Sequence, residues 1–469
     1  HLGPEFVDFI CRCGCGALQS LHLSVGMMGS DVPARLTAIE NRLGGLEEKM
    51  DRMLAIFEQL RDSAAEATET RQPFVNRVRD AVAQGSREET GAEEKTSNDY
   101  FKPTCKQRRA QKVAEDAVYK VWEAAEEAPE SIRTVADNFV GNGGDDVVEL
   151  MENTSFIDVH YLIALAEAGG IVPRWQEVPS VAKLHKGNAW RLRFWDDSFT
   201  LPTLIWSYCW LSPHHPDPIG EQLQKALPIM KLMLSHAQSY SEHATIAVMQ
   251  DYMSYPQHPR TPAEDVRFKK GLMTELNLLY SHPYTPVLMF TTPMSNAPEH
   301  TNLAPYDTRG WCRVERAMAS VVKDGECLWD LSKWVPQETY DGISKMMSAK
   351  RLPLVSPDAI ASEIRTGVAS GDIKFISSAD MERVIELYRK GFKRSFETFK
   401  KGMIHYTILG WGDDEVPTLI EAFKYAEEHC EIPNQLSLLF SIGNEFSDDG
   451  CAEMNAAFAY SDKFLMMVN

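Results

Sequence analysis

The sequence lacks long hydrophobic runs and has no excess of basic charge. Its apolar stretches, such as Leu201–Leu211, stay far below the roughly 20 residues that a membrane-spanning helix needs. Its 67 Asp and Glu residues outnumber its 48 Lys and Arg residues, which leaves a net charge of -19. A surface of that sign is unsuited to the phosphates of nucleic acids and of anionic membranes. We therefore expect no membrane span and no nucleic-acid partner.

Several motifs that define enzyme classes are also missing. Neither of the Gly-rich phosphate loops, GxGxxG and GxxxxGK[ST], occurs in the chain. The HExxH motif of zinc proteases and the GxSxG motif of α/β-hydrolases are absent as well. The nine cysteines include no CxxC pair and no zinc-ligand spacing. These absences predict no metal site, no required cofactor, and reduced thiols in a cytoplasmic protein.

Residues 1–30 form a predicted N-terminal tail. Its first 26 residues start without Met, contain Gly-Pro-Glu-Phe and precede Met27-Met28. We interpret residues 1–26 as vector or untranslated sequence read in frame, and we leave them out of the fold argument. A metal site formed by Cys11, Cys13 and Cys15 is the alternative interpretation of the tail.

Residues 31–62 show the pattern of a coiled coil. Apolar residues recur there with an unbroken spacing of three and four, and charged residues lie between them. Gly44-Gly45 interrupts the helix-forming sequence. We expect a homo-oligomer through residues 32–60, and an amphipathic helix packed on its own domain is the alternative. The polar residues 63–98 then form a linker. The apolar positions of the seam are Leu36, Ile39, Leu43, Leu46, Met50, Met53, Phe57 and Leu60.

The rest of the chain divides into three regions. Residues 99–199 are mostly helical in pattern. In residues 200–325 strand signals alternate with helix signals, which predicts a parallel sheet covered on both faces. The strands carry no polar alternation, as expected for strands that are buried on both sides. We expect strands at 204–211, 245–249 and 287–290, and helices at 106–127, 158–168, 219–236, 267–280 and 311–322.

Residues 326–469 form an α-rich C-terminal region with a long helix at 379–400 and a short strand candidate at 373–376. Asp413-Asp414 recurs as Asp448-Asp449, with an offset of 35 residues. The stretch from Asn444 to Gly450 resembles a step of the ribonuclease-inhibitor-type leucine-rich repeats, although the spacing here is longer. The resemblance implies a leucine-rich-repeat-like unit at 403–460 and a protein partner for the C-terminal region.

Polar and aromatic residues follow the predicted strands at the point where each strand ends. Because the carboxyl ends of parallel strands share one edge of a sheet, these residues are expected to converge there. A helix that begins near Trp311 places one carboxylate, Glu315, at the same edge. The candidates are Ser207, Tyr208 and Trp210 after the first strand, Asp251 and Tyr252 after the second, and Arg309, Trp311 and Glu315 at the helix.

These blocks together resemble the Toll/interleukin-1 receptor (TIR) superfamily, and most closely its fungal relative, the heterokaryon-incompatibility (HET) domain. HET domains are similar at Ser-Tyr-x-Trp, at Asp-x-x-x-x-x-Gln, at a Met-x-x-x-Tyr-like helix and at Arg-Gly-Trp-x-x-x-Glu. TIR domains carry a similar Trp-Cys-x-x-Glu. The resemblance covers about residues 200–325. The matching residues are Ser207, Tyr208, Trp210, Asp251, Gln257, Leu276 in place of Met, Tyr280, Arg309, Gly310, Trp311, Cys312 and Glu315.

The resemblance implies a flavodoxin-like α/β fold and cleavage of the nicotinamide–ribose bond of NAD. A carboxylate at Glu315 would stabilise the positive charge that develops on the ribose. Tyr208, Trp210 and Tyr252 would stack on the rings of the substrate, and Arg309 would meet the diphosphate.

Each of these residues also has a structural explanation. The helix dipole alone favours Glu315 in a first turn, and Arg309 would then be its ion-pair partner. Trp210 and Trp311 would be core residues, Asp251 a loop cap, and Cys312 a buried thiol.

We therefore predict an α/β protein with helical flanking regions and an N-terminal coiled-coil helix. Its expected role is intracellular signalling, with NAD as a substrate that is hydrolysed after oligomerisation. The alternative is an oligomeric scaffold or interaction module that has the same fold and no turnover. A flavodoxin-like nucleotide-binding protein with an unrelated ligand is a third interpretation.

Overall fold

The computed structural model describes residues 103–133, 138–197, 199–212, 214–292, 294, 302–323, 325–375, 377, 379–399, 402–440 and 442–468. The predicted tail at 1–30, the coiled coil at 31–62 and the linker at 63–98 lie outside the described residues.

A six-stranded mixed sheet forms the centre of the described region. Its strand order is β2-β1-β4-β3-β5-β6. The last four strands in that order run parallel to one another, and β1 pairs antiparallel with both β2 and β4. The strands are β1 (Phe156–Asp158), β2 (Lys183–Leu184), β3 (Thr203–Ser207), β4 (Ala247–Met249), β5 (Val287–Met289) and β6 (Leu328–Asp330).

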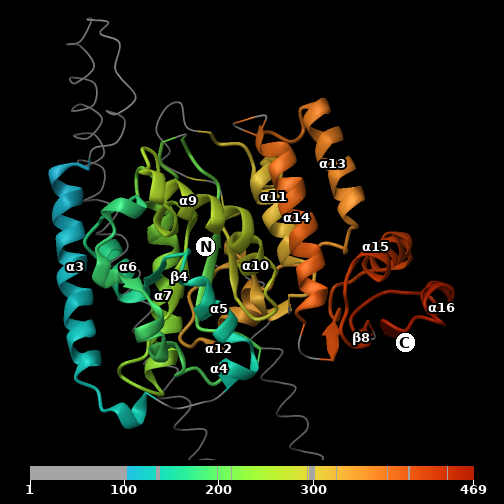
Figure 1. Ribbon diagram of the computed structural model, residues 1–469, viewed down its shortest axis with the longest axis horizontal. Coiled ribbons are helices and arrows are strands. Elements are labelled where there is room, and N and C mark those ends of the chain that lie inside the picture. Colours follow the sequence, from blue (N-terminus) through green and yellow to red (C-terminus); the bar gives the residue numbers. More distant parts are fainter. Residues whose placement is uncertain are drawn as a thin grey trace, which may run out of the picture. The chain divides into compact units, whose positions relative to one another are not determined.

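Helices cover both faces of this sheet (Figure 1). Alternate residues of β3 point to opposite faces, as the pleat requires. Leu204 and Trp206 pack with α6 and α7, whereas Ile205 packs with α10 and α11. A further helix lies outside each layer, α3 against α6 and α14 against α10 and α11. The bounds are α3 (Cys105–Glu126), α6 (Val159–Glu167), α7 (Glu221–Gln238), α10 (Leu276–Ser281), α11 (Gly310–Ala319) and α14 (Ala379–Glu397).

The prediction of a parallel sheet is correct for four strands and wrong for the edge formed by β1 and β2. These two strands have three and two residues, too few to show a periodic pattern in the sequence. They come from the stretch that was expected to be mostly helical. Asp158 at the end of β1 accepts hydrogen bonds from Arg191 (2.7 Å) and from Thr245 just before β4 (2.7 Å). This buried contact fixes β1 at the side of β4.

The strand expected at 204–211 is shorter than predicted, because β3 ends at Ser207. The Ser207 carbonyl accepts the last ladder hydrogen bond, from the Phe290 amide at 2.9 Å. Residues 208–211 then leave the sheet. Their apolar character comes from burial outside the sheet, where Tyr208 and Leu211 are 6% and 2% exposed.

The helix expected at 267–280 starts earlier and contains an irregular turn. It begins at α9 (Pro262–Lys270), where Thr261 and Glu264 form a capping box. A π-helical turn, η6 (Gly271–Glu275), joins α9 to α10. A Cβ on Gly271 would clash with the ring of Tyr255, so this close approach requires glycine.

The C-terminal strands and helices alternate along the chain. Three parallel strands pair in the order β7-β8-β9, and the Asn444 side chain donates to the carbonyls of Tyr406 (2.7 Å) and Phe440 (2.8 Å). The leucine-rich-repeat-like assignment of 403–460 stays a prediction. The bounds are β7 (Met403–His405), α15 (Val416–His429), β8 (Leu436–Leu439), α16 (Asp448–Ala457) and β9 (Phe464–Met467). Four shorter helices elsewhere are α4 (Asn138–Gly141), α5 (Gly144–Leu150), α8 (Asp251–Ser254) and α12 (Asp341–Met347), and α13 spans Pro357–Ser370.

The strand candidate at 373–376 is wrong. Among the described residues 373–375, only Lys374 forms a bridge, which is parallel to Arg309. The bridge uses the hydrogen bonds from Lys374 N to Thr308 O (2.9 Å) and from Gly310 N to Lys374 O (3.0 Å). The ring of the next residue, Phe375, lies directly on Gly310, where a Cβ would approach ring atoms to well under 3.0 Å. The glycine of Arg-Gly-Trp is therefore explained by a contact with a distant segment.

We expect Gly310→Ala to lower the free energy of unfolding by about 1–3 kcal/mol, because a rigid ring has to move to admit the methyl group. Urea denaturation would measure this change. Gly325→Ala is the matched control, since nothing lies within 4 Å of a Cβ at that glycine. In a Phe375→Ala background the ring is gone, so Gly310→Ala should no longer lower the free energy of unfolding by this amount. An equal effect of Gly310→Ala in both backgrounds would contradict the steric explanation.

Candidate functional site

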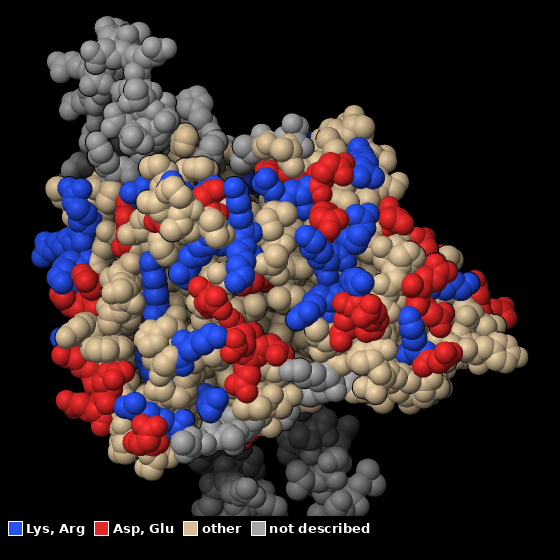
Figure 2. Space-filling view, viewed as in Figure 1, with Lys and Arg blue, Asp and Glu red and all other residues tan. Residues whose placement is uncertain are grey.

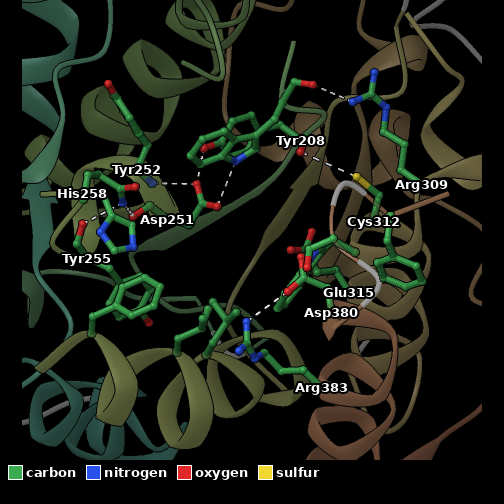
Figure 3. A pocket seen from close by; sticks show the side chains of 18 of the residues that line it. Tyr208, Asp251, Tyr252, Tyr255, His258, Arg309, Cys312, Glu315, Asp380 and Arg383 are labelled. Atoms are coloured by element: carbon green, nitrogen blue, oxygen red, sulfur yellow. Dashed lines mark hydrogen bonds and ion pairs between the residues drawn. The ribbon is translucent and has the colours of Figure 1, made fainter. Parts of the chain in front are cut away.

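A pocket of about 1160 Å³ lies at the carboxyl edge of the parallel strands (Figure 3). Its wall combines the loop after β3, the helix α8 after β4, the α9–η6–α10 helix and the start of α11. The C-terminal region completes the wall beside α11 through Lys374, Phe375, Ser377, Asp380 and Arg383. The blocks that were predicted to converge therefore do meet around one cavity.

Glu315 projects from α11 into this pocket and is held by hydroxyl groups. Ser207 Oγ, at the end of β3, donates to Glu315 Oε2 at 2.5 Å. The hydroxyl groups of Ser207 and Tyr306 are hydrogen-bonded to each other. The Tyr280 hydroxyl donates to the Trp206 carbonyl at 3.0 Å and lies beside the Glu315 carboxyl group. Among the described residues, no Lys, Arg or His forms an ion pair with Glu315. The ion pair with Arg309 considered from the sequence is therefore not formed.

The surroundings of Glu315 favour its protonated form. Burial raises the pKa of this carboxyl group from its ordinary value of 4.5 to about 8. The hydrogen bond from Ser207 and the neighbouring Tyr280 hydroxyl lower the pKa, and the nearby carboxylate of Asp251 raises it. At neutral pH the group is therefore mostly a neutral acid. A cation placed beside it would favour the carboxylate.

Asp251 forms the second acidic position of the pocket, in the first turn of α8. Its carboxyl group accepts hydrogen bonds from the Tyr208 hydroxyl, from Trp210 Nε1 (3.0 Å) and from the Tyr252 amide (2.6 Å). Burial raises its pKa, and these hydrogen bonds act in the opposite direction. The rings of Trp210 and Tyr252 meet edge to face, with centroids 5.6 Å apart. Asp251 therefore holds the aromatic side chains in fixed positions on the pocket wall.

Arg309 lines the pocket and has a clear structural task. Its guanidinium donates to the carbonyl of Ala304 through Nε (3.0 Å) and to that of Trp210 through Nη1 (2.6 Å). Nη2 donates to the carbonyl of Asn302. The side chain thus joins the loop after β3 to the segment that precedes α11. A direct contact of Arg309 with a diphosphate stays a prediction.

Cationic side chains surround the acidic centre of the pocket. Six Lys or Arg residues line it, against four Asp or Glu residues. On the face shown in Figure 2, Lys and Arg side chains gather over α9 and α14, which border the pocket. A protein with a net charge of -19 therefore has a pocket whose lining carries more cations than anions. The cations are Arg174, Arg260, Lys269, Arg309, Lys374 and Arg383, and the acids are Glu177, Asp251, Glu315 and Asp380.

Seven of the eight candidate residues from the sequence line the pocket, and Ser207 lies behind it. Ser207 is fully buried, so the structure places it as a support for Glu315 and not at the pocket surface. Trp311 also lines the wall, where its Nε1 donates to Asp380 at 3.3 Å.

Sequence reasoning missed several residues of the site. It did not single out Tyr306, whose hydroxyl supports Ser207, and it noted Tyr280 only as part of a motif. The wall formed by Lys374, Phe375 and Arg383 was also missed. The only available signal was the Met-x-x-x-Tyr-like spacing that ends at Tyr280.

The comparisons with known proteins add no relative: no protein-family model, no curated protein and no solved structure matches this chain. In the part of the chain that the structure describes, none of the helices has the length and apolar character to cross a bilayer. The same residues contain no group of three or more His, Cys, Asp or Glu side chains placed to hold a metal ion.

The raised pKa of Glu315 predicts that the fold loses stability as the pH rises from about 5 to about 8. In this range the folded state keeps a proton that the unfolded state has released, since the unfolded pKa is near 4.5. The free energy of unfolding should fall by at most about 1.4 kcal/mol per pH unit from this group. Urea denaturation at several pH values would measure the slope.

Glu315→Gln should remove the contribution of Glu315 to the slope of unfolding free energy against pH, because the glutamine side chain has no proton to release. Glu338→Gln, at an exposed position, is the matched control and should keep the wild-type slope. Identical slopes for wild type and Glu315→Gln would contradict the raised pKa.

Proposed function

We propose that this chain is a signalling protein whose HET/TIR-like domain hydrolyses the nicotinamide–ribosyl bond of NAD, with Glu315 as the catalytic residue. One observation carries the proposal. The Glu315 carboxyl group reaches a large pocket where the blocks after β3 and β4 and at α11 meet, and no described cation neutralises it. A carboxyl group held only by hydroxyl groups suits a reaction in which positive charge develops nearby.

The strand order supports a flavodoxin-like assignment for the parallel part of the sheet. The order β4-β3-β5-β6 corresponds to 2-1-3-4 when these four strands are counted along the chain. In flavodoxin-like sheets the ligand sits where the strand order reverses, which here is between β3 and β5. Ser207 is the last residue of β3, so its partner Glu315 lies at this switch point. The antiparallel edge of β1 and β2 is an addition to that order.

The charges of the pocket support a ligand with both signs of charge. The diphosphate of NAD is anionic, and the surrounding cations such as Arg260 and Lys374 match it. The nicotinamide ring of NAD carries a positive charge, which would favour the carboxylate form of Glu315. Trp210, Tyr252 and Trp311 provide aromatic surfaces for the two ring systems.

In the proposed reaction the bond between nicotinamide and the ribose carbon breaks, and nicotinamide leaves with the bonding electron pair. The Glu315 carboxylate stabilises the positive charge left on the ribose. Water then adds to the ribose carbon and releases one proton, which gives ADP-ribose. Ser207 holds the carboxylate in position from behind through its hydrogen bond.

On this proposal the protein acts in the cytoplasm, and assembly through residues 32–60 brings several α/β domains together. The C-terminal region would bind a protein partner.

We expect the concentrated full chain to release nicotinamide from NAD, and Glu315→Gln to lower the rate by about 100-fold or more, because a charge-stabilising group is lost. Mass spectrometry of NAD, nicotinamide and ADP-ribose would follow the reaction. Glu338→Gln should leave the rate unchanged. kcat/KM of the wild type should rise with pH and level off above about pH 8, since the free protein must lose the Glu315 proton.

The alternative function is a scaffold that oligomerises without turnover. NAD that stays intact with the wild type at every protein concentration would reject the enzymatic proposal and leave the scaffold. Turnover that survives in Glu315→Gln would instead reject the assigned role of Glu315.

A further inference from the structure

Two cysteines from distant parts of the chain face each other beside the pocket. Cys209 lies two residues after the end of β3, and Cys312 lies in the first turn of α11. Their sulfur atoms are 3.8 Å apart. Cys312 is buried on the pocket wall, and Cys209 is partly exposed, which leaves Cys209 accessible to a small reagent. Neither thiol has a role in the proposed hydrolysis.

We propose that Cys209 and Cys312 form a peroxide-reactive dithiol, which a hydroperoxide converts to a disulfide that ties the end of β3 to α11. The two sulfurs need to approach by only about 1.8 Å to reach the S–S bond length. Both side chains sit on segments that already pack together, because Cys312 Sγ also contacts the Tyr208 carbonyl at 3.6 Å.

The surroundings give the two thiols different roles. The hydrogen bond from Cys312 lowers the pKa of Cys209, and the Arg309 guanidinium acts in the same direction. Cys209 is also partly exposed whereas Cys312 is buried, so Cys209 is the thiol that meets the oxidant and attacks it as a thiolate. The pKa of Cys312 is raised by its hydrogen bond to Cys209 and by burial. Loss of the negative charge on the Cys209 sulfur removes one of the causes that raise the pKa of Cys312.

The chemistry takes two steps. The Cys209 thiol releases its proton, and the thiolate attacks one oxygen of the hydroperoxide. The O–O bond breaks, a sulfenic acid forms, and the leaving hydroxide or alkoxide takes up the released proton as water or alcohol. The Cys312 thiol then loses its proton and attacks the Cys209 sulfur. The S–O bond breaks, water leaves, and the S–S bond forms. With hydrogen peroxide the balance is two thiols and one peroxide to one disulfide and two waters.

The disulfide would lie one helical turn from Glu315 and would hold the start of α11 against the end of β3. These are the two segments that carry Glu315 and its partner Ser207. Oxidation would therefore fix the spacing of the acidic centre of the pocket, and a reductant would release it.

The test exposes the reduced full chain to one equivalent of hydrogen peroxide, blocks the remaining thiols with iodoacetamide and maps the peptides by mass spectrometry. We expect a Cys209–Cys312 linked peptide in most molecules, reversed by dithiothreitol, and a midpoint of thermal unfolding that rises on oxidation. Cys105, which is exposed, should stay at least tenfold less oxidised. Recovery of both cysteines as separate alkylated or over-oxidised peptides would overturn the proposal.

Two variants separate the roles of the thiols. Cys312→Ala should accumulate the Cys209 sulfenic acid, which dimedone traps, whereas Cys209→Ser should show little oxidation at Cys312. Equal dimedone labelling of Cys209 in wild type and Cys312→Ala would contradict the assignment of Cys312 as the resolving thiol. The wild-type peptide map decides the proposal even where a variant does not fold. NAD takes no part in this experiment, so its outcome is independent of the proposed hydrolysis.

Discussion

The hydrogen bond between Ser207 and Glu315 is the contact on which the organisation of the site depends. It joins the last residue of a central strand to the first turns of a helix more than 100 positions later in the chain. The β3 ladder fixes Ser207, and Tyr306 supports it from the other side. A partly buried acid without a cationic partner is costly unless other groups satisfy it. The surrounding hydroxyls meet that need and leave the carboxyl group open toward the pocket.

The pocket is built by more of the chain than residues 200–325. Phe375 packs on Gly310, and Asp380 accepts a hydrogen bond from Trp311. Both contacts join the C-terminal region to the motif that carries Glu315. The same region contributes Lys374 and Arg383 to the rim. A fragment that ends near residue 325 would therefore lack one wall of its own pocket.

The sequence predicted the parts of this site that follow from short-range pattern and parallel topology. The apolar runs that became β3, β4 and β5 are recognisable, and parallel strands necessarily bring Ser207, Asp251 and the α11 region to one edge. The edge strands β1 and β2 were too short to be recognised.

Other properties of the site depend on the three-dimensional structure. The hydrogen bond between the hydroxyl groups of Tyr306 and Ser207 could not be predicted from the sequence, because no local pattern relates the two residues. The raised pKa of Glu315 depends on how far distant segments of the chain shield its carboxyl group from water. The sequence composition does not predict that shielding. The task of Arg309 in holding two loops became visible only from its carbonyl partners.

The π-helical turn explains how one helix lines a long stretch of the cavity. In a regular α-helix, side chains four positions apart rotate by about 40° at each step, so a row of four drifts away from a common face. The wider turn of Gly271–Glu275 counteracts this drift. Phe268, Leu272, Leu276 and Tyr280 thus all reach the same cavity. One additional residue in a single turn therefore keeps these four side chains on one side of the helix, facing the pocket. Tyr280, the last of the four, lies beside Glu315.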